Sequence, residues 1–284
     1  MPIMNTVIAG GGSPAPAQVP DYYPKLTVNQ NGELEKDLSQ TTFSTAPATD
    51  IATTELFMDA FTDLSGLGNH YRIQTINLDS LTDVTAESAF MSAFMGLGTV
   101  TSFSAAGLTT INGSNVFNTG FCDVDNGASN NYVSTFSFPA LTEIYGAYVF
   151  QEAWARNMRV VSLSFPLLEL ISVEDFIAAC TGSPLVASAS FPSLTFVDSG
   201  AFNRAFSDIS PSTYDFPTHT LTLTFGGTDP IDFNGNVDCF EDMLDGTDID
   251  VTINAPLASQ SDFEQMTGYP DFGCTGTVTW NWQS

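Results

Sequence analysis

The chain has 284 residues, enough for one or two domains with a sizeable core, and 43% of them are hydrophobic. Only 13% are charged, and 32 Asp and Glu against 6 Lys and Arg give a net charge of −26. This balance argues against nucleic acid and anionic membranes as partners, because both are bound by clustered Lys and Arg. The 23 Phe, 8 Tyr and 3 Trp argue against a disordered chain.

The N-terminal segment differs in composition from the rest. Residues 1–24 are rich in Gly, Pro and Ala, which is typical of an extended or flexible arm. They show no pattern of a secretion signal, and no run in the chain approaches the roughly 20 apolar residues of a membrane span. Residues 25–55 are predicted to cap the first of the repeats that follow, because stacked repeats expose an apolar face at each end.

A repeated phrase begins at residue 56. Most copies begin with an apolar residue followed directly by Phe. Two further residues come next, and then a second pair of small or apolar residues. Residues at i and i+4 lie on one face of a helix, so each copy is predicted to be a single helical turn against a core. The copies span residues 56–61, 89–94, 116–121, 149–154, 175–180 and 201–206, with weaker copies at 239–244 and 262–267.

Between these phrases lie short stretches in which apolar and polar residues alternate, as in half-buried strands. A leucine follows most of them, at positions 81, 108, 141, 168 and 194. Such a unit cannot bury its apolar face alone, so the pattern predicts an α/β repeat solenoid over residues 56–284, closed by the last strand. The predicted strands are residues 73–80, 100–105, 132–138, 159–165, 185–191, 221–226, 250–254 and 277–282.

Two segments carry the repeat most clearly, Phe138-Pro-Ala-Leu-Thr-Glu-Ile-Tyr-Gly-Ala-Tyr-Val-Phe150 and Phe191-Pro-Ser-Leu-Thr-Phe-Val-Asp-Ser-Gly-Ala-Phe202. They resemble the units of BspA-like leucine-rich repeats, and the resemblance covers about residues 55–284. It implies a leucine-rich-repeat solenoid with a parallel β-sheet on one face and short helical turns on the other. It also implies binding to proteins or surfaces without catalysis.

Three intervals between a phrase and the next strand are longer than the others, which places loops at residues 64–71, 122–131 and 207–220. All three have the same phase in the repeat and are expected along one edge, where repeat proteins commonly bind partners. Neutral variation of surface loops is the alternative. The residues expected to contact a partner are Asn69, His70, Tyr71, Asp123, Asp125, Asn126, Tyr132, Tyr214 and His219.

The sequence gives little support for catalysis. The two histidines, His70 and His219, stand about five repeats apart and are interpreted as solvated loop residues. A hydrolase that uses paired loop carboxylates is an alternative, but among 32 acids some pair will be close by chance. No cofactor is expected. Calcium is an open possibility at the Asp-rich stretches 123–127, 228–238 and 245–250, where Asx turns are the other interpretation.

The four cysteines are widely spaced and form no CxxC pair, which argues against a zinc site. Cys180 and Cys239 fall at positions that are apolar in other repeats, so both are predicted to be buried thiols. One or two disulfides remain open.

These observations favour a non-enzymatic binding, adhesion or display protein. A short Gly-rich start without a signal resembles those of some bacteriophage tail and virion proteins. The leading hypothesis is therefore a protein on the virion surface, whose residues 1–24 dock on phage structural proteins while the solenoid presents a surface to a protein or carbohydrate. The alternative is a secreted or cell-surface bacterial adhesin.

Overall fold

The computed structural model describes residues 42–46, 48–60, 73–96, 99–122 and 133–284, together with the backbone of two short strands before them. The chain divides into two compact units, residues 1–37 and 38–284. In the first unit, β1 (Leu26–Val28) and β2 (Leu34–Lys36) form an antiparallel pair. The predicted arm, residues 1–24, lies outside the described residues.

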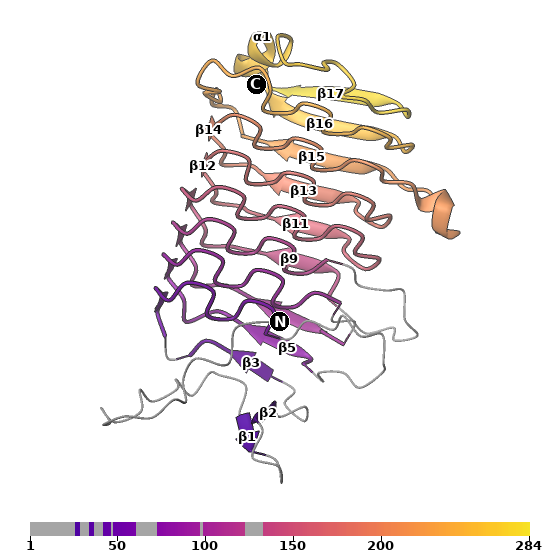
Figure 1. Ribbon diagram of the computed structural model, residues 1–284. Coiled ribbons are helices and arrows are strands. Elements are labelled where there is room, and N and C mark those ends of the chain that lie inside the picture. Colours follow the sequence, from indigo (N-terminus) through magenta and orange to yellow (C-terminus); the bar gives the residue numbers. More distant parts are fainter. Residues whose placement is uncertain are drawn as a thin grey trace. The chain divides into compact units, whose positions relative to one another are not determined.

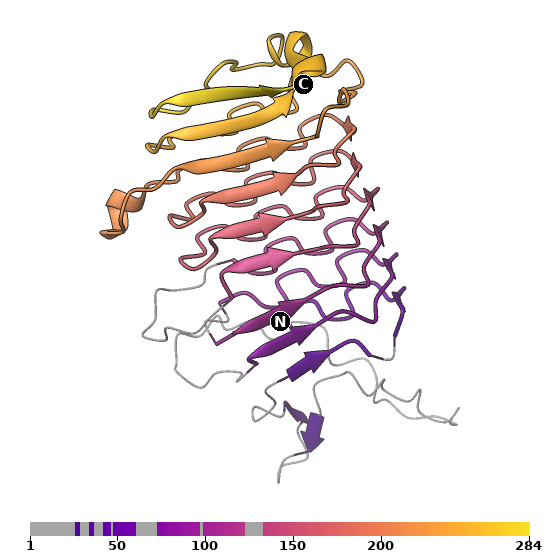
Figure 2. The same cartoon turned by 180° about the vertical axis from the view of Figure 1, so that it is seen from behind.

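The second unit contains two stacks of short parallel strands, which run side by side in both views of the molecule (Figures 1 and 2). We use the word coil for one turn of the repeat. A coil begins at a strand of the first stack and ends where the next strand of that stack begins. The first stack consists of two hydrogen-bonded sheets. One contains β3 (Thr42–Ser44), β5 (Thr75–Asn77) and β7 (Ser102–Ser104), and the other contains β9 (Thr135–Ser137), β11 (Ser162–Ser164), β13 (Ser188–Phe191), β15 (Leu221–Phe225), β16 (Val251–Pro256) and β17 (Val278–Gln283).

The predicted strands are confirmed, since each of the eight alternating stretches holds one strand of the first stack. The observed strands are mostly shorter than predicted. Parallel pairing of β3 with β5 brings residues 42–44 into the same array, so the first coil begins within the segment interpreted as a cap.

The second stack was not predicted. Its strands are two residues long, and all but the first of them follow one of the repeated leucines, which are themselves buried. They are β4 (Asp50–Ile51), β6 (Asp83–Val84), β8 (Thr110–Ile111), β10 (Glu143–Ile144), β12 (Leu170–Ile171) and β14 (Phe196–Val197).

The repeated phrases form series of tight turns, which corrects the predicted helical turns. In the coil around Phe150, every fourth residue has a positive φ: 61° at Tyr148, 51° at Glu152 and 52° at Arg156. The Phe150 N–H donates to the Asp175 carbonyl of the next coil at 2.8 Å. Helical segments in the described residues are limited to η1 (Pro211–Tyr214), η2 (Leu257–Ser259) and α1 (Gln260–Phe263).

Hydrogen bonding between coils explains this choice of backbone. An α-helix satisfies its N–H groups internally, so it would leave the neighbouring coil without donors. A left-handed residue other than glycine costs about 1–2 kcal/mol, and a hydrogen bond returns about 0.5–1.5 kcal/mol. Since alternate N–H groups of the first six phrases donate to the next coil, the bonds offset much of the strain there.

A column of phenylalanine rings runs through the core. Each phrase contributes one ring, and neighbouring rings are 5.1–5.5 Å apart between centroids. A second column, Phe138, Phe165, Phe191 and Phe225, packs against the first at steep ring angles. The first column is Phe57, Phe90, Phe117, Phe150, Phe176, Phe202, Phe240 and Phe263.

Gly146 lies where two coils approach closely. A Cβ atom at this position would be 2.0 Å from the Gly113 carbonyl oxygen of the preceding coil. We therefore expect Gly146→Ala to lower the free energy of unfolding by about 1–3 kcal/mol, since the backbone of one coil must shift. Urea unfolding checks this, with Gly227→Ala as the control because its nearest atom would be at 3.2 Å. Equal midpoints for the two variants would contradict the close packing.

All four cysteines are free thiols. Cys180 and Cys239 are buried, as predicted. Burial raises the pKa of the Cys180 thiol, and burial together with nearby Asp238 and Asp198 raises that of Cys239 to about 12.

Slow alkylation should follow from this burial, because the thiolate is the reactive form. In the folded protein at pH 8 we expect iodoacetamide to label the half-buried Cys274 first and to leave Cys180 and Cys239 intact. Peptide mapping by mass spectrometry reads the order, and labelling in urea is the control in which all four thiols react. Early modification of Cys180 would contradict the packed core.

In the described part of the chain, no helix combines the length and apolar character required to cross a bilayer.

Candidate binding surface

The loop between β14 and β15 is the one predicted insertion that the structure describes. Residues 64–71 and nearly all of 122–131 lie outside the described residues. The same holds for seven predicted contact residues: Asn69, His70, Tyr71, Asp123, Asp125, Asn126 and Tyr132.

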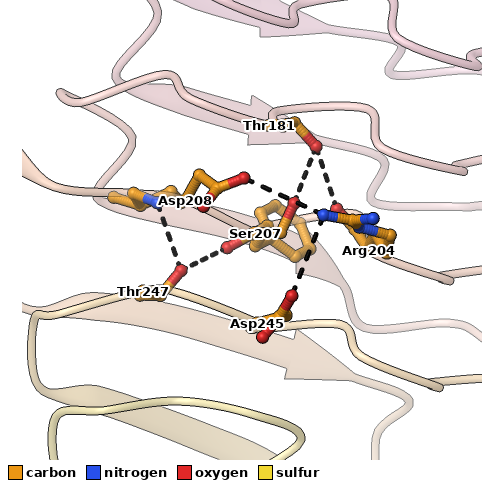
Figure 3. A network of polar contacts seen from close by, with 8 residues as sticks. Thr181, Arg204, Ser207, Asp208, Asp245 and Thr247 are labelled. Carbon is orange, nitrogen blue, oxygen red and sulfur yellow. Dashed lines mark hydrogen bonds and ion pairs between the residues drawn. The ribbon is translucent and has the colours of Figure 1, made fainter.

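Polar contacts fix the start of this loop on the coils at either side (Figure 3). The Thr181 hydroxyl donates to the Arg204 carbonyl at 3.1 Å and lies 2.9 Å from the Ser207 hydroxyl. On the other side, the Thr247 hydroxyl donates to the Phe206 carbonyl at 2.6 Å and accepts the Ile209 N–H at 3.2 Å. The start of the loop is thus bonded to the coil before it and the coil after it.

Arg204 adds charge to this network but little stability. Its guanidinium is 4.0 Å from the Asp208 carboxylate and 3.8 Å from that of Asp245, and all three side chains are about half exposed. Solvent screens such pairs, which typically contribute about 0–1 kcal/mol each. Figure 3 shows Arg204 between these two carboxylates.

The structure gives Tyr214 and His219 different roles. Tyr214 ends η1 and is 44% exposed, so its ring is available to a partner. His219 Nε2 is 2.8 Å from the Val186 carbonyl, which can only accept, so Nε2 carries the proton. His219 therefore attaches the end of the loop to the neighbouring coil.

Two further tyrosines face acidic neighbours on the coils. Tyr145 is 51% exposed and hydrogen-bonds Glu143, and Tyr148 hydrogen-bonds Glu174 of the next coil. The pKa of Tyr145 is raised mainly by desolvation and then by Glu143, whereas that of Tyr148 is raised mainly by its bond to Glu174.

Carboxylates of the described Asp-rich stretches accept hydrogen bonds both within a turn and from another coil. Asp232 accepts the Asn234 N–H at 2.8 Å, and Asp248 accepts the Ser210 hydroxyl at 2.7 Å. Among the described residues, no group of three or more His, Cys, Asp and Glu side chains is arranged to hold a metal ion. The Asx-turn interpretation therefore accounts for Asp232, while residues 123–127 lie outside the described part.

The outward side of the first stack is a surface that the sequence analysis missed. In the triplets Thr135–Ser137 and Ser162–Ser164 the central residue is buried, so the flanking residues lie on the opposite side of the strand. Parallel register aligns these positions from coil to coil. Their alternation is visible in the sequence as Thr-Phe-Ser, Ser-Leu-Ser and Thr-Leu-Thr.

We call this surface the hydroxyl face, and it carries Ser, Thr and Asn in two columns. All of these side chains are exposed or half-buried, and none is charged. One column is Thr42, Thr75, Ser102, Thr135, Ser162, Ser188, Thr222, Thr252 and Thr279, and the other is Ser44, Asn77, Ser104, Ser137, Ser164, Ser190, Thr224, Asn254 and Asn281.

Side chains of the hydroxyl face bond one another from coil to coil. The Thr135 and Ser162 hydroxyls are 2.8 Å apart, and Asn281 Nδ2 donates to Asn254 Oδ1 at 3.2 Å. A hydroxyl has one donor and two acceptor positions, so such a contact leaves bonding capacity for a ligand.

In a comparison with known proteins, no family model, curated protein or solved structure matches the chain. The sequence resemblance to BspA-like repeats thus receives no support from these comparisons.

Proposed function

We propose that the chain is a leucine-rich-repeat solenoid that acts by binding a partner and not by catalysis. The observation that carries the proposal is the strict parallel register, which repeats the same outward side chains on coil after coil. Binding to such a fixed, repeated surface avoids the entropy cost of ordering its side chains and backbone. The loop that presents Tyr214 adds an exposed aromatic ring to the same scaffold.

The proposed setting is the surface of a bacteriophage particle. The division of the chain into residues 1–37 and 38–284 is consistent with separate docking and display parts. The low Lys and Arg content also suits an extended surface that avoids nucleic acid. In this proposal residues 1–24 attach to structural proteins of the particle, and the solenoid faces outward.

Purified particles and cell envelopes from the source organism test the setting. Mass spectrometry of each fraction, with immunogold electron microscopy, is expected to find the protein on particles. Deletion of residues 1–24 is expected to release it, whereas Tyr214→Ala should leave it attached. Recovery only in the envelope fraction would contradict the virion setting and favour the adhesin, and attachment without residues 1–24 would contradict the docking arm.

A further inference from the structure

We propose that the hydroxyl face binds a neutral, linear polysaccharide whose chain lies across the strands. This inference rests on the proposed binding function and assigns it a surface and a ligand class. Three properties of the face lead to it: its charge, its dimensions and its rigidity.

Charge selects a neutral ligand. The chain carries a net charge of −26, yet no position of the two columns is Asp, Glu, Lys or Arg, and the Asp79 carboxylate at their border accepts the Ser104 hydroxyl. An anionic polymer would be repelled by the chain as a whole and would find no cation on this face. A neutral ligand with many hydroxyls can donate to and accept from Ser, Thr and Asn, and no charged group has to lose its water.

The dimensions favour a linear polymer over a folded protein. The six hydrogen-bonded strands from β9 to β17 lie about 4.8 Å apart, which gives this part of the face a length of about 24 Å, and residues two apart along a strand separate the columns by about 6.6 Å. Such a strip covers roughly 160 Å² between the columns, well below the roughly 800 Å² that each partner buries in a standard protein interface. An extended β-linked sugar chain advances by about one strand spacing per sugar, so successive sugars would meet equivalent hydroxyls.

Rigidity lowers the cost of binding. The residues between the two columns include Phe136, Leu163 and Leu223, which are buried, and Phe136 packs against Phe121 and Trp154. Backbone ladders fix the register of each strand, and Ser and Thr have few rotamers to lose. The hydroxyls are therefore held in place before the ligand arrives.

Affinity electrophoresis of the full chain tests the proposal, in gels cast with hydroxyethylcellulose, glucomannan or arabinoxylan, and with carboxymethylcellulose as the anionic comparison. The test variant is Ser164→Lys/Ser190→Lys, which places two long charged side chains on neighbouring strands of the hydroxyl face. The matched control, Thr110→Lys/Ser172→Lys, makes the same change of charge and side-chain size at half-buried hydroxyls of the second stack and its following corner. Urea unfolding verifies that both variants remain folded.

We expect at least one neutral polysaccharide to retard the wild-type chain, with little dependence on salt. The face variant should bind at least tenfold more weakly, and the control variant should bind as the wild type does. The proposal is overturned if none of the neutral polymers retards the wild type, if carboxymethylcellulose alone does so, or if the face variant keeps its affinity. In each of those cases attachment to particles, measured separately, still decides the proposed function.

Discussion

Replacing Phe150 by alanine is expected to lower the free energy of unfolding by about 3–5 kcal/mol, the range for large aromatic side chains in cores. Phe150 is fully buried, and its ring contacts rings of both phenylalanine columns. Its ring stacks on Phe117 and Phe176 of the neighbouring coils at 5.5 and 5.1 Å, and meets Phe138 and Phe165 edge-on at 5.3 and 5.6 Å. The substitution opens a cavity at the junction of both columns, so several rings lose contacts together.

Urea unfolding followed by circular dichroism measures this loss, and Tyr145→Ala is the control. Tyr145 belongs to the same coil but is half exposed, so its truncation should change stability by no more than about 0.5 kcal/mol. Amide hydrogen exchange shows where the structure is weakened. Because each coil contacts mainly its neighbours, we expect the protection of backbone amides to fall around residues 117, 150 and 176. A loss below about 1 kcal/mol would mean that the ring columns contribute little to the core.

The strands could be predicted because their signal is local. Alternation in segments such as Arg159–Phe165 indicates a half-buried strand without knowledge of its partner. The second stack escaped prediction because strands such as Glu143–Ile144 are too short to show a period. Only their alignment with neighbouring coils makes them strands, and that alignment is a property of the three-dimensional structure.

The repeated phrases show where a correct pattern gave the wrong backbone. The spacing of Val149 and Ala153 fits a helical turn, and the prediction that both are buried is confirmed. The same spacing also fits turns with a four-residue period, marked by the positive φ of Tyr148 and Glu152. Residue preference identifies these turns only in part, because Asp, Asn and Gly occupy some of the left-handed positions while Ser, Thr, Glu, Ala, Arg and Tyr occupy others.

For the candidate surface, the sequence pattern indicates the loops but not the strands. Tyr214 and His219 stand out because they interrupt the repeat. Ser164 and Ser190 do not interrupt it, and the apolar half of the alternation points to the core alone. The polar residues of the alternation are equally informative. Side chains on the solvent side of each strand must form a continuous outward surface when the strands stack.

Asp175 is an acid at a position that most other coils fill with apolar residues. It stands in the column of Val149 and Ala201, and like them it is fully buried. Its Oδ1 accepts the Val149 N–H at 3.3 Å, while its Oδ2 has no hydrogen-bond partner. Burial therefore raises the pKa of Asp175 well above its ordinary value of 3.8, although the N–H groups of Val149 and Ser172 partly oppose the shift.

A raised pKa makes this residue stabilising in acid and destabilising in base. Below pH 3.8 the carboxyl is protonated in both the folded and the unfolded chain, so no charge has to be buried. As the pH rises from there through the higher pKa of the folded state, the unfolded chain loses its proton first. The folded state then binds more protons than the unfolded state, and its stability falls with pH.

Asp175→Asn should remove this dependence, because asparagine is neutral and keeps an oxygen for the Val149 N–H. We expect the variant to be more stable than the wild type at pH 8 by at least about 1 kcal/mol, the lower range for an uncompensated buried polar group. The advantage should shrink as the pH falls toward 4. Urea unfolding of both proteins across this range measures it, and subtracting one curve from the other cancels the titration of the remaining acids. A constant difference, or a larger advantage in acid, would show that the Asp175 carboxyl is not held in its neutral form by the core.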